Sequence, residues 1–300
     1  MYVITGATGN TGAVITERLL ARGERVRVLG RDAGRLGRLV QKGADPVVAD
    51  VTDSNVVTRA FIGAKAVYLM IPPDVAAPDV RAFQERVSDA LTAATEHAGV
   101  EYAVLLSSIG ADKADGTGPV IGLHNFEQKL NGIPQLKALY VRAGYFMENL
   151  LPQVGVIKSF GMMAGPVRAD LRLPMIATRD IGTFAAEALL DLTFNGKQTR
   201  ELLGQREVTY AEAASLIGKA VAKPDLSYSQ LPASQLKPAL VQMGMSSNMA
   251  DLLLTMADAL NSGHMVALES RSAQNTTPTP IEQFIGDDFV PRFMGKRAGV

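Results

Sequence analysis

The first 140 residues alternate between short apolar, β-branched runs and longer segments whose apolar residues recur at helical spacing. Nearly continuous apolar runs are typical of strands buried on both faces of a parallel sheet. They predict strands at residues 2–5, 25–29, 46–49, 66–71, 102–106 and 136–141. The intervening segments predict helices at residues 10–22, 32–42, from 53 onward, and 79–98.

Glycines mark the ends of these predicted helices. Gly23, Gly43, Gly63 and Gly99 each follow a helical segment, where glycine readily adopts the left-handed conformation that ends a helix. Strands and helices in regular succession are typical of parallel sheets, because a helix carries the chain back to start the next strand. We therefore expect an α/β fold with a Rossmann-type, doubly wound parallel sheet.

The pattern changes after about residue 142. Helices are expected from Asp180 to Leu192, after Thr209 with Glu212 completing a capping box, over 246–262 and briefly over 281–285. A short strand is expected at 201–203. We expect a NAD(P)-binding domain over 1–150 and a smaller, mostly helical C-terminal lobe over 151–300. This lobe would complete a substrate cleft above the carboxyl ends of the strands, and the two segments are free to interleave.

The composition removes several classes of function. The 300 residues include no cysteine, which excludes disulfides, thiolate nucleophiles and cysteine-based metal sites. Thirty basic residues balance thirty acidic ones, so no overall charge draws the chain to nucleic acid or to an acidic membrane. No apolar run approaches the roughly 20 residues that span a bilayer, and no signal sequence follows Met1. We expect a cytoplasmic protein without direct nucleic-acid or membrane partners.

A glycine-rich loop follows the first predicted strand and opens the first helix. Its glycines have the spacing G-x-x-G-x-x-G, and its expected cofactor-binding residues are Gly6, Thr8, Gly9, Asn10, Thr11 and Gly12. Small residues let the backbone approach a pyrophosphate, whose charge then meets the free amides of the helix N-terminus. In this context the loop predicts dinucleotide binding. The alternative is a tight turn that binds no ligand.

The end of the second strand indicates which dinucleotide is preferred. Sites for NAD usually have an acidic residue there, whereas this chain has Arg31, 19 positions after Gly12. A guanidinium group can pair with the 2′-phosphate of NADP(H), so we favour NADP(H) over NAD(H). Asp32 is expected to cap the next helix, and Arg35 could assist Arg31. The alternative for Arg31 is a solvated surface side chain.

Two more strand ends are expected to line the same cofactor. Asp50 and Val51 follow the third strand, where a carboxylate can accept a hydrogen bond from the adenine amino group. Ile71 and Pro72 follow the fourth strand, where the chain must pass the cofactor's ribose. The alternatives are helix capping for Asp50 and simple turn rigidity for the proline segment.

Several stretches together resemble one family. They are the glycine loop, Arg31, Leu-Leu-Ser-Ser at 105–108, His-Asn-Phe-Glu at 124–127, Arg-Ala-Gly-Tyr-Phe-Met-Glu-Asn at 142–149 and Thr-Arg-Asp-Ile at 178–181. The chain resembles the NmrA-like branch of the atypical short-chain dehydrogenase/reductases over nearly its whole length. The resemblance implies either an NADPH-dependent reductase of quinones, azo dyes or triphenylmethane dyes, or a catalytically silent regulator that senses the dinucleotide. It also implies that Ser107, at the fifth strand, belongs to the cofactor site.

The chain departs from the wider superfamily at the catalytic pair. That superfamily uses Tyr-x-x-x-Lys, whereas the corresponding helix here contains His124, with Gln128 four residues later. His124 is therefore the candidate proton donor, and the alternative is a histidine on the helix surface packed beside Tyr145. Tyr145 is expected to stack on a flat acceptor or to belong to the core. Asn149 could orient a loop or bind the substrate.

These features favour a reductase over a regulator. We expect hydride transfer from NADPH to a small, flat, aromatic or quinone-like acceptor, with the silent NAD(P)-sensing regulator as the alternative. Five methionines between Met243 and Met265 suit an adaptable apolar pocket or ordinary core. His97 and His264 have no metal-ligand spacing with acidic residues, so no metal is expected. A homodimer is compatible with the sequence.

Overall fold

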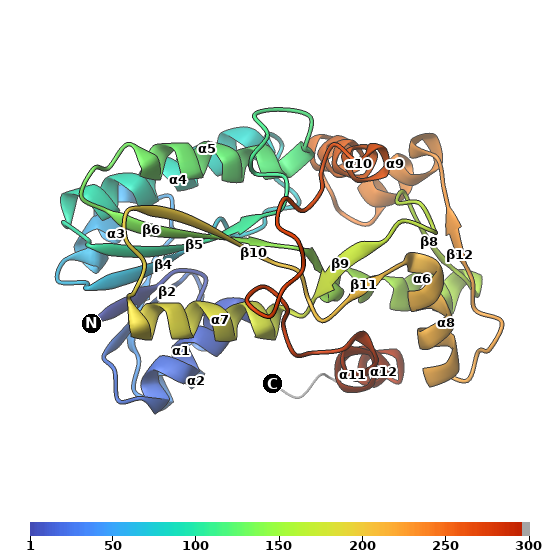
Figure 1. Cartoon of the computed structure of the whole chain (residues 1–300), viewed down its shortest axis with the longest axis horizontal. Helices are drawn as coiled ribbons and strands as arrows, with labels where there is room; N and C mark the ends of the chain where they lie inside the picture. Colours follow the sequence, from blue (N-terminus) through green and yellow to red (C-terminus); the bar gives the residue numbers. More distant parts are fainter. Residues whose placement is uncertain (296–300) are drawn as a thin grey trace.

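The computed structural model describes residues 1–295, and its centre is a sheet of seven parallel strands (Figure 1). The order across the sheet is β10-β6-β5-β4-β1-β2-β3. The strands are β1 (Tyr2–Ile4), β2 (Val26–Gly30), β3 (Asp45–Val48), β4 (Ala66–Leu69), β5 (Tyr102–Ser108), β6 (Lys137–Ala143) and β10 (Lys197–Leu202). The predicted doubly wound Rossmann-type sheet is confirmed, and the six strands expected before residue 142 are all present.

Helices cover both faces of this sheet (Figure 1). One face carries α1 (Asn10–Ala21), α2 (Ala33–Gln41) and α7 (Thr178–Asp191), and the other carries α3 (Ser54–Phe61), α4 (Val80–His97) and α5 (Ile121–Asn131). Successive side chains of a strand point to opposite faces, so Tyr2 and Ile4 join the core under α1, while Val3 joins the core under α4. This double burial explains why the central strands are apolar at nearly every position.

Short polar residues and glycines set the helix ends as the sequence predicts. Asp32, Asp53 and Asp79 cap α2, α3 and α4 by accepting hydrogen bonds from backbone amides of the first helical turn. The four glycines expected at helix ends all have positive φ, between 61° and 99°. Thr209 caps α8 (Tyr210–Ala220) by accepting from the Glu212 amide, which is one half of the predicted capping box, whereas the Glu212 carboxylate accepts from Arg206 at 2.6 Å.

The chain returns to the first sheet after residue 150. α7 packs beside α1, and β10 pairs in parallel with β6 along the edge of the sheet. The sequence predicts only a short strand at 201–203, whereas β10 begins at Lys197. Its sequence Lys-Gln-Thr-Arg-Glu-Leu is polar because one of its sides is an exposed edge, and polar edge strands lack the apolar signal of buried ones. The division into two units near residue 150 stays a prediction. The two parts interleave, because α7 and β10 belong to the first sheet although they follow residue 150.

The remaining residues form a smaller lobe at one end of the sheet (Figure 1). Its strands are β7 (Tyr145–Phe146), β9 (Leu173–Ile176) and β11 (Glu207–Val208) in one small sheet, and β8 (Met163–Gly165) with β12 (Tyr228–Gln230) in another. Its helices are α6 (Gln153–Phe160), α8, α9 (Ala233–Gln242), α10 (Ser247–Ser262), α11 (Ile281–Phe284) and α12 (Val290–Phe293), with short turns η1 (Gly118–Val120), η2 (Met147–Leu150) and η3 (Ile285–Phe289). A separate apolar core holds this lobe together. Within residues 1–295, no helix is long and apolar enough to cross a membrane.

Candidate active site at the carboxyl edge of the sheet

The glycine loop joins β1 to α1 as a tight turn. Gly6 has a φ of +61°, and its carbonyl accepts a hydrogen bond from the Gly9 amide at 2.9 Å. A Cβ atom at Gly12 would lie 2.4 Å from the Gly6 oxygen, so only glycine lets the helix and the turn approach this closely. Gly9 precedes α1 in extended conformation, and no side chain of the described residues caps the helix. The first amides of α1 are therefore open to an anion.

The loop's side chains are fixed by the chain around it. Thr11 is buried and accepts a hydrogen bond from the Tyr68 hydroxyl at 2.9 Å, and burial raises the pKa of Tyr68. The carbonyl of Thr8 accepts a hydrogen bond from Arg35 at 3.1 Å, while Asn10 is exposed. Thr11 therefore supports the loop from the core side, and Arg35 ties the loop to α2.

Arg31 and Asp32 follow β2 and have different environments. Asp32 accepts a hydrogen bond from the Arg35 amide at 3.1 Å, which confirms its predicted capping role. Arg31 is exposed and has no hydrogen bond or ion pair within residues 1–295. Its charge does reach Asp50, because Arg31 is one of the groups that lower the pKa of that carboxyl after the larger contribution of the hydrogen bond from the Thr52 amide. Arg31 thus presents a free guanidinium group beside the end of β3.

The ends of β3 and β4 lie along the same edge. Asp50 accepts hydrogen bonds from the Thr52 amide at 2.9 Å and from its hydroxyl at 2.8 Å, and Val51 is buried. Ile71 and Pro72, after β4, are half-buried and line a cavity. The structure therefore brings the loop, Arg31, Asp50 and Ile71 to one edge of the sheet, where α/β folds bind their ligands.

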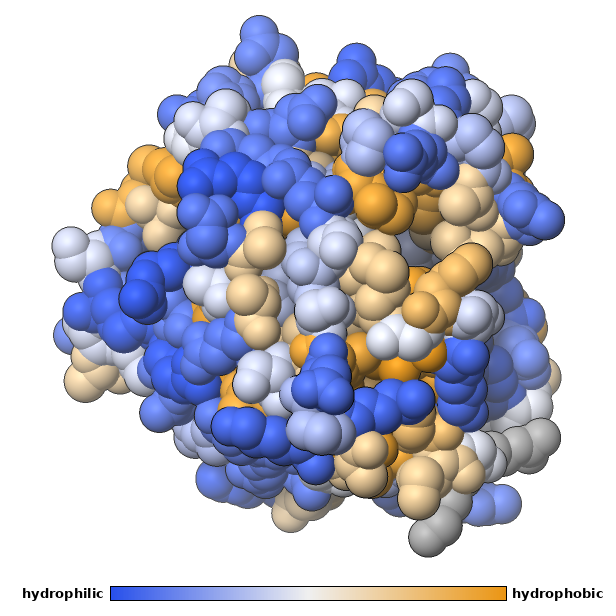
Figure 2. Space-filling model, turned by 90° about the vertical axis from the view of Figure 1, so that its right-hand side faces the viewer, coloured by the Kyte–Doolittle hydropathy of each residue, from blue (hydrophilic) through white to orange (hydrophobic). Residues whose placement is uncertain are grey.

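A cavity of about 1030 Å³ lies between this edge and the lobe. The ends of β4, β5 and β6 form its floor, and α10 and the segments around β9 form its roof. Its apolar lining includes Met70, Ile71, Leu106, Val120, Leu123, Tyr145, Phe146, Leu171, Met249, Met256, Leu260 and Met265. Hydrophobic residues also gather between hydrophilic margins on the lobe's outer end (Figure 2). Of the five methionines between 243 and 265, Met249, Met256 and Met265 line the cavity, whereas Met243 is exposed.

Ser107 belongs to a buried polar group that sequence reasoning did not assemble. Its hydroxyl donates to Glu127 Oε1 at 2.6 Å, and Arg142 donates to both oxygens of Glu127, at 3.0 and 2.6 Å. Glu127 is buried on α5, and Ser107 lies opposite Arg142 in the pairing of β5 with β6. The sequence could have indicated this group only through Ser107 and Arg142, which lie at the ends of two neighbouring predicted strands. The position of Glu127 between them depends on how α5 packs.

The two candidate catalytic residues have different locations. His124 is half-buried on α5, with Nδ1 2.9 Å from the Ala111 carbonyl oxygen, and it is not among the residues that line the cavity. Leu123, one position earlier, does line the cavity, and neighbouring residues on a helix point about 100° apart. Tyr145 lines the cavity, and its hydroxyl lies 2.8 Å from that of Tyr210. The structure thus brings Tyr145, and not His124, to the cavity wall.

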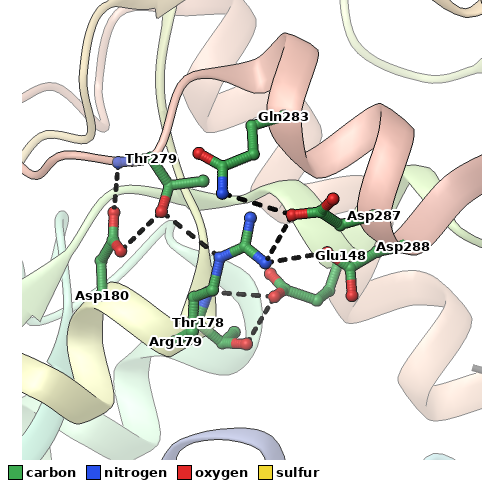
Figure 3. A network of polar contacts seen from close by, with 8 residues as sticks. All are labelled: Glu148, Thr178, Arg179, Asp180, Thr279, Gln283, Asp287 and Asp288. Atoms are coloured by element: carbon green, nitrogen blue, oxygen red, sulfur yellow. Dashed lines mark hydrogen bonds and ion pairs between the residues drawn. The ribbon is translucent and has the colours of Figure 1, made fainter. Parts of the chain in front are cut away.

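A polar clasp links the wall of the cavity to the C-terminal segment (Figure 3). Glu148 of η2 accepts hydrogen bonds from the Thr178 amide at 3.0 Å and from its hydroxyl, and so caps α7. Asp180 accepts hydrogen bonds from the Thr279 amide at 3.0 Å and hydroxyl at 2.7 Å. Arg179 lies 3.4 Å from both Asp287 and Asp288. The clasp consists of these side chains, and it ties η2 and α7 to residues 279–288.

The sequence of the chain also matches the model of a known protein family. The model of the NmrA-like family matches residues 2–285, which covers both the sheet and the lobe. The chain belongs to the NmrA-like family. This agrees with the resemblance read from the loop, the Arg142–Asn149 stretch and the Thr178–Ile181 stretch.

Several known proteins are similar to this chain over almost its whole length. The uncharacterized oxidoreductase YesF of Bacillus subtilis is 27% identical over 290 residues, 94% of this chain and 93% of its own. The NADPH-dependent quinone oxidoreductase QOR2 of Escherichia coli, solved with NADPH, superimposes with a TM-score of 0.77 at 20% identity, covering 100% of this chain and 96% of its own. The triphenylmethane reductase of Citrobacter sp., solved with NADP(H), gives 0.76 at 17% identity over 95% and 99%. These two likenesses show a shared fold.

The edge fits a dinucleotide on its own evidence. The loop has no room for a Cβ at Gly12 and exposes the first amides of α1, which suits a pyrophosphate. Arg31 provides a cation without a partner among the described residues. No group of three or more His, Asp or Glu side chains within residues 1–295 is arranged to hold a metal ion.

Proposed function

We propose that this protein is an NADPH-dependent reductase that transfers hydride to a flat, conjugated acceptor such as a quinone or a dye. One observation carries the proposal: the apolar cavity adjoins the first residue of the glycine loop. Met70 lines the cavity, and a Cβ atom at Gly6 would lie 2.5 Å from the Met70 sulfur. A dinucleotide anchored at the loop would therefore have its nicotinamide end directed to an apolar compartment.

The residues at the edge divide the cofactor between them in this proposal. The loop residues 6–12 and the amides of α1 hold the pyrophosphate, and Arg31 pairs with the 2′-phosphate that distinguishes NADPH from NADH. Asp50 and Val51 lie at the adenine, and Ile71, Pro72 and Ser107 lie toward the nicotinamide. The bound cofactor supplies the hydride, and the protein supplies its orientation.

The cavity wall suits a flat acceptor rather than a sugar. Tyr145 and Phe146 offer aromatic faces, and four methionines offer flexible thioethers that adapt to different ring systems. Excluding water from such a compartment strengthens the electrostatic interactions inside it. Aromatic or quinone-like small molecules are therefore the proposed substrates.

Two measurements test this function. NADPH should raise the melting temperature more than NADH, because only NADPH carries the 2′-phosphate that Arg31 is proposed to bind. A ligand at a hundredfold excess over its Kd stabilises the folded state by about 3 kcal/mol, which such a measurement detects. The purified protein should then oxidise NADPH in the presence of at least one quinone, azo dye or triphenylmethane dye. Tight NADPH binding with no acceptor reduced across the panel would contradict the reductase and favour the regulator, whose protein partner a pull-down with and without NADP⁺ would identify.

A further inference from the structure

Three tyrosines lie one behind the other, from the cavity wall into the lobe. Tyr145 lines the cavity, and its hydroxyl lies 2.8 Å from the hydroxyl of Tyr210. The Tyr145 and Tyr210 rings meet edge to face with centroids 6.1 Å apart, and Tyr210 stacks on Tyr228 at 4.5 Å. Tyr210 and Tyr228 are buried and do not line the cavity. The Tyr210 hydroxyl therefore contacts the cavity only through Tyr145.

The hydrogen bonds in this group give Tyr145 a defined direction. Tyr228 donates its proton to the Val167 carbonyl at 2.7 Å. Among the described residues the Tyr210 hydroxyl has Tyr145 as its one partner, so its buried proton is satisfied by donation to the Tyr145 oxygen. Asn149 also lines the cavity, and it is one of the groups that lower the pKa of the Tyr145 hydroxyl against the larger effect of burial. Tyr145 thus accepts from behind, and its own proton is free to point into the cavity.

The surroundings keep this hydroxyl protonated and in place. Burial raises the pKa of Tyr145 and also that of Tyr210, so both are neutral at physiological pH. Tyr145 lies on β7, which pairs with β9, and Asn149 follows Glu148 on η2. The clasp holds Glu148 against α7 (Figure 3), which restricts the movement of Asn149 as well. A donor that is oriented before the acceptor arrives is the arrangement that favours stabilisation of a developing oxyanion.

We propose that Tyr145 is the proton donor to a quinone oxygen, and that Tyr210 is a positioning residue that holds its hydroxyl as a donor. This rests on the proposed function. The quinone gains a hydride from NADPH and its carbonyl oxygen takes the Tyr145 proton, which yields the hydroquinone, NADP⁺ and a tyrosinate. Water then returns a proton to the tyrosinate. The chain therefore supplies by another route the donor that the absent Tyr-x-x-x-Lys pair would provide.

A comparison of two acceptors isolates this role. Reduction of a quinone places charge on an oxygen, whereas a cationic triphenylmethane dye takes hydride at carbon and becomes neutral, so it needs no proton. Tyr210→Phe should lower kcat for the quinone about tenfold, as expected for one lost hydrogen bond, and leave kcat for the dye nearly unchanged. Tyr145→Phe should lower the quinone kcat about a hundredfold. Tyr228→Phe is the matched control, because it removes a buried hydroxyl from the same stack without touching Tyr145.

A binding experiment tests the same donor without catalysis. Nitrophenol changes colour on ionisation, and a donor in the cavity would lower the pKa of the bound molecule. Because the apolar surroundings are shared, we expect the pKa of bound nitrophenol to be lowest in the wild type and in Tyr228→Phe, higher in Tyr210→Phe, and highest in Tyr145→Phe. Equal losses for quinone and dye in Tyr210→Phe, or an identical nitrophenol pKa in all four proteins, would overturn the assignment. A wild type that reduces neither acceptor would refute the proposed reductase, while the nitrophenol titration would still decide the donor.

Discussion

At the scale of single residues, two kinds of polar side chain lie at the carboxyl edge of the sheet. Some form hydrogen bonds within the protein, and others have polar atoms without a partner. Asp32 caps α2, Thr11 accepts from Tyr68 and Ser107 donates to Glu127, so each of these serves the fold directly. Arg31 has no partner in the described part of the chain. In the proposed function this free cation pairs with the 2′-phosphate of NADPH.

Among these hydrogen bonds, the sequence predicts the one between neighbouring residues and misses those between residues far apart in the chain. Asp32 can be identified as a cap because its acceptor lies three residues away on the same helix. The contact of Ser107 with Glu127 spans 20 residues and depends on the packing of α5 against the sheet. His124 illustrates the same limit, because a shift of one helical position decides whether a side chain reaches the cavity. Motifs identify residues, but only packing decides where their atoms point.

Arg31→Ala should remove the preference for NADPH. Losing a hydrogen bond between charged groups lowers affinity by about ten- to a hundredfold, and NADH, which has no 2′-phosphate, should bind as before. Fluorescence titration with both dinucleotides measures the change. Arg38→Ala, which removes another exposed arginine further along α2, should alter neither affinity. An unchanged ratio of the two affinities in Arg31→Ala would exclude Arg31 from the cofactor site.

Glu148 should make stability depend on pH. Burial raises the pKa of its carboxyl above the ordinary value, against the smaller effect of its hydrogen bonds with Thr178. The folded state therefore holds this proton more tightly than the unfolded chain does, so the stabilisation is fully present below the ordinary pKa and is lost as pH rises through the raised one. Glu148→Gln stays neutral and keeps an oxygen for Thr178.

Chemical denaturation from acidic to neutral pH measures this effect. Glu148→Gln should gain stability over the wild type as pH rises, by about 1 kcal/mol at neutral pH, where the wild type has a buried carboxylate oxygen without a partner among the described residues. Glu148→Ala is the contrasting variant: it also lacks the titrating carboxyl, but it leaves the Thr178 amide without its cap, so it should be about 1 kcal/mol less stable than Glu148→Gln at every pH. A pH-independent difference between the wild type and Glu148→Gln would contradict the raised pKa.

At the scale of elements, predictability follows burial. The strands at the centre of the sheet, which are covered on both faces, and most helices with a buried stripe are visible in the sequence. The exposed edge strand β3 is visible as well, whereas α6, with Gln153, Val154 and Ile157 buried, is not predicted. β10 escapes because its exposed edge makes it polar, and α9 escapes because none of its residues is buried and Pro238 lies inside it. α7 is predicted as a helix, but not its return to the first sheet. Long-range pairing leaves no local signal, so the interleaving of the two parts cannot be deduced from periodicity.

The hydrogen bonds of the clasp should hold the C-terminal segment against α7. Thr279→Val removes the hydroxyl that donates to Asp180 while keeping the side chain's shape, and should destabilise the fold by about 1–2 kcal/mol. Hydrogen exchange should increase over residues 279–293 and remain slow in β1 and β4, because the sheet has its own core. Thr276→Val is the control, since Thr276 makes no side-chain hydrogen bond within residues 1–295. Uniformly faster exchange would indicate that the clasp supports the whole fold.

At the scale of the whole molecule, two separately built parts share one cavity. The sheet supplies the edge that suits a dinucleotide, and the lobe supplies most of the apolar roof. Composition predicts an apolar second part, but the enclosed volume depends on how α10 and β9 are placed over β5 and β6. Cofactor affinity and acceptor preference should therefore respond to different parts of the chain.

Filling the cavity from the roof tests this separation. Met256 lines the cavity from α10, so Met256→Trp should raise KM for a bulky triphenylmethane dye about tenfold, raise it less for a small quinone, and leave the Kd for NADPH unchanged. Thr255→Trp adds the same ring on an exposed position of that helix and should change none of these values. If Met256→Trp weakened NADPH binding as strongly as it raised KM for the dye, the roof would belong to the cofactor site. An acceptor site formed by the lobe requires instead that the two effects separate, because the cofactor is expected to depend on the sheet's edge and the acceptor on the space beneath α10.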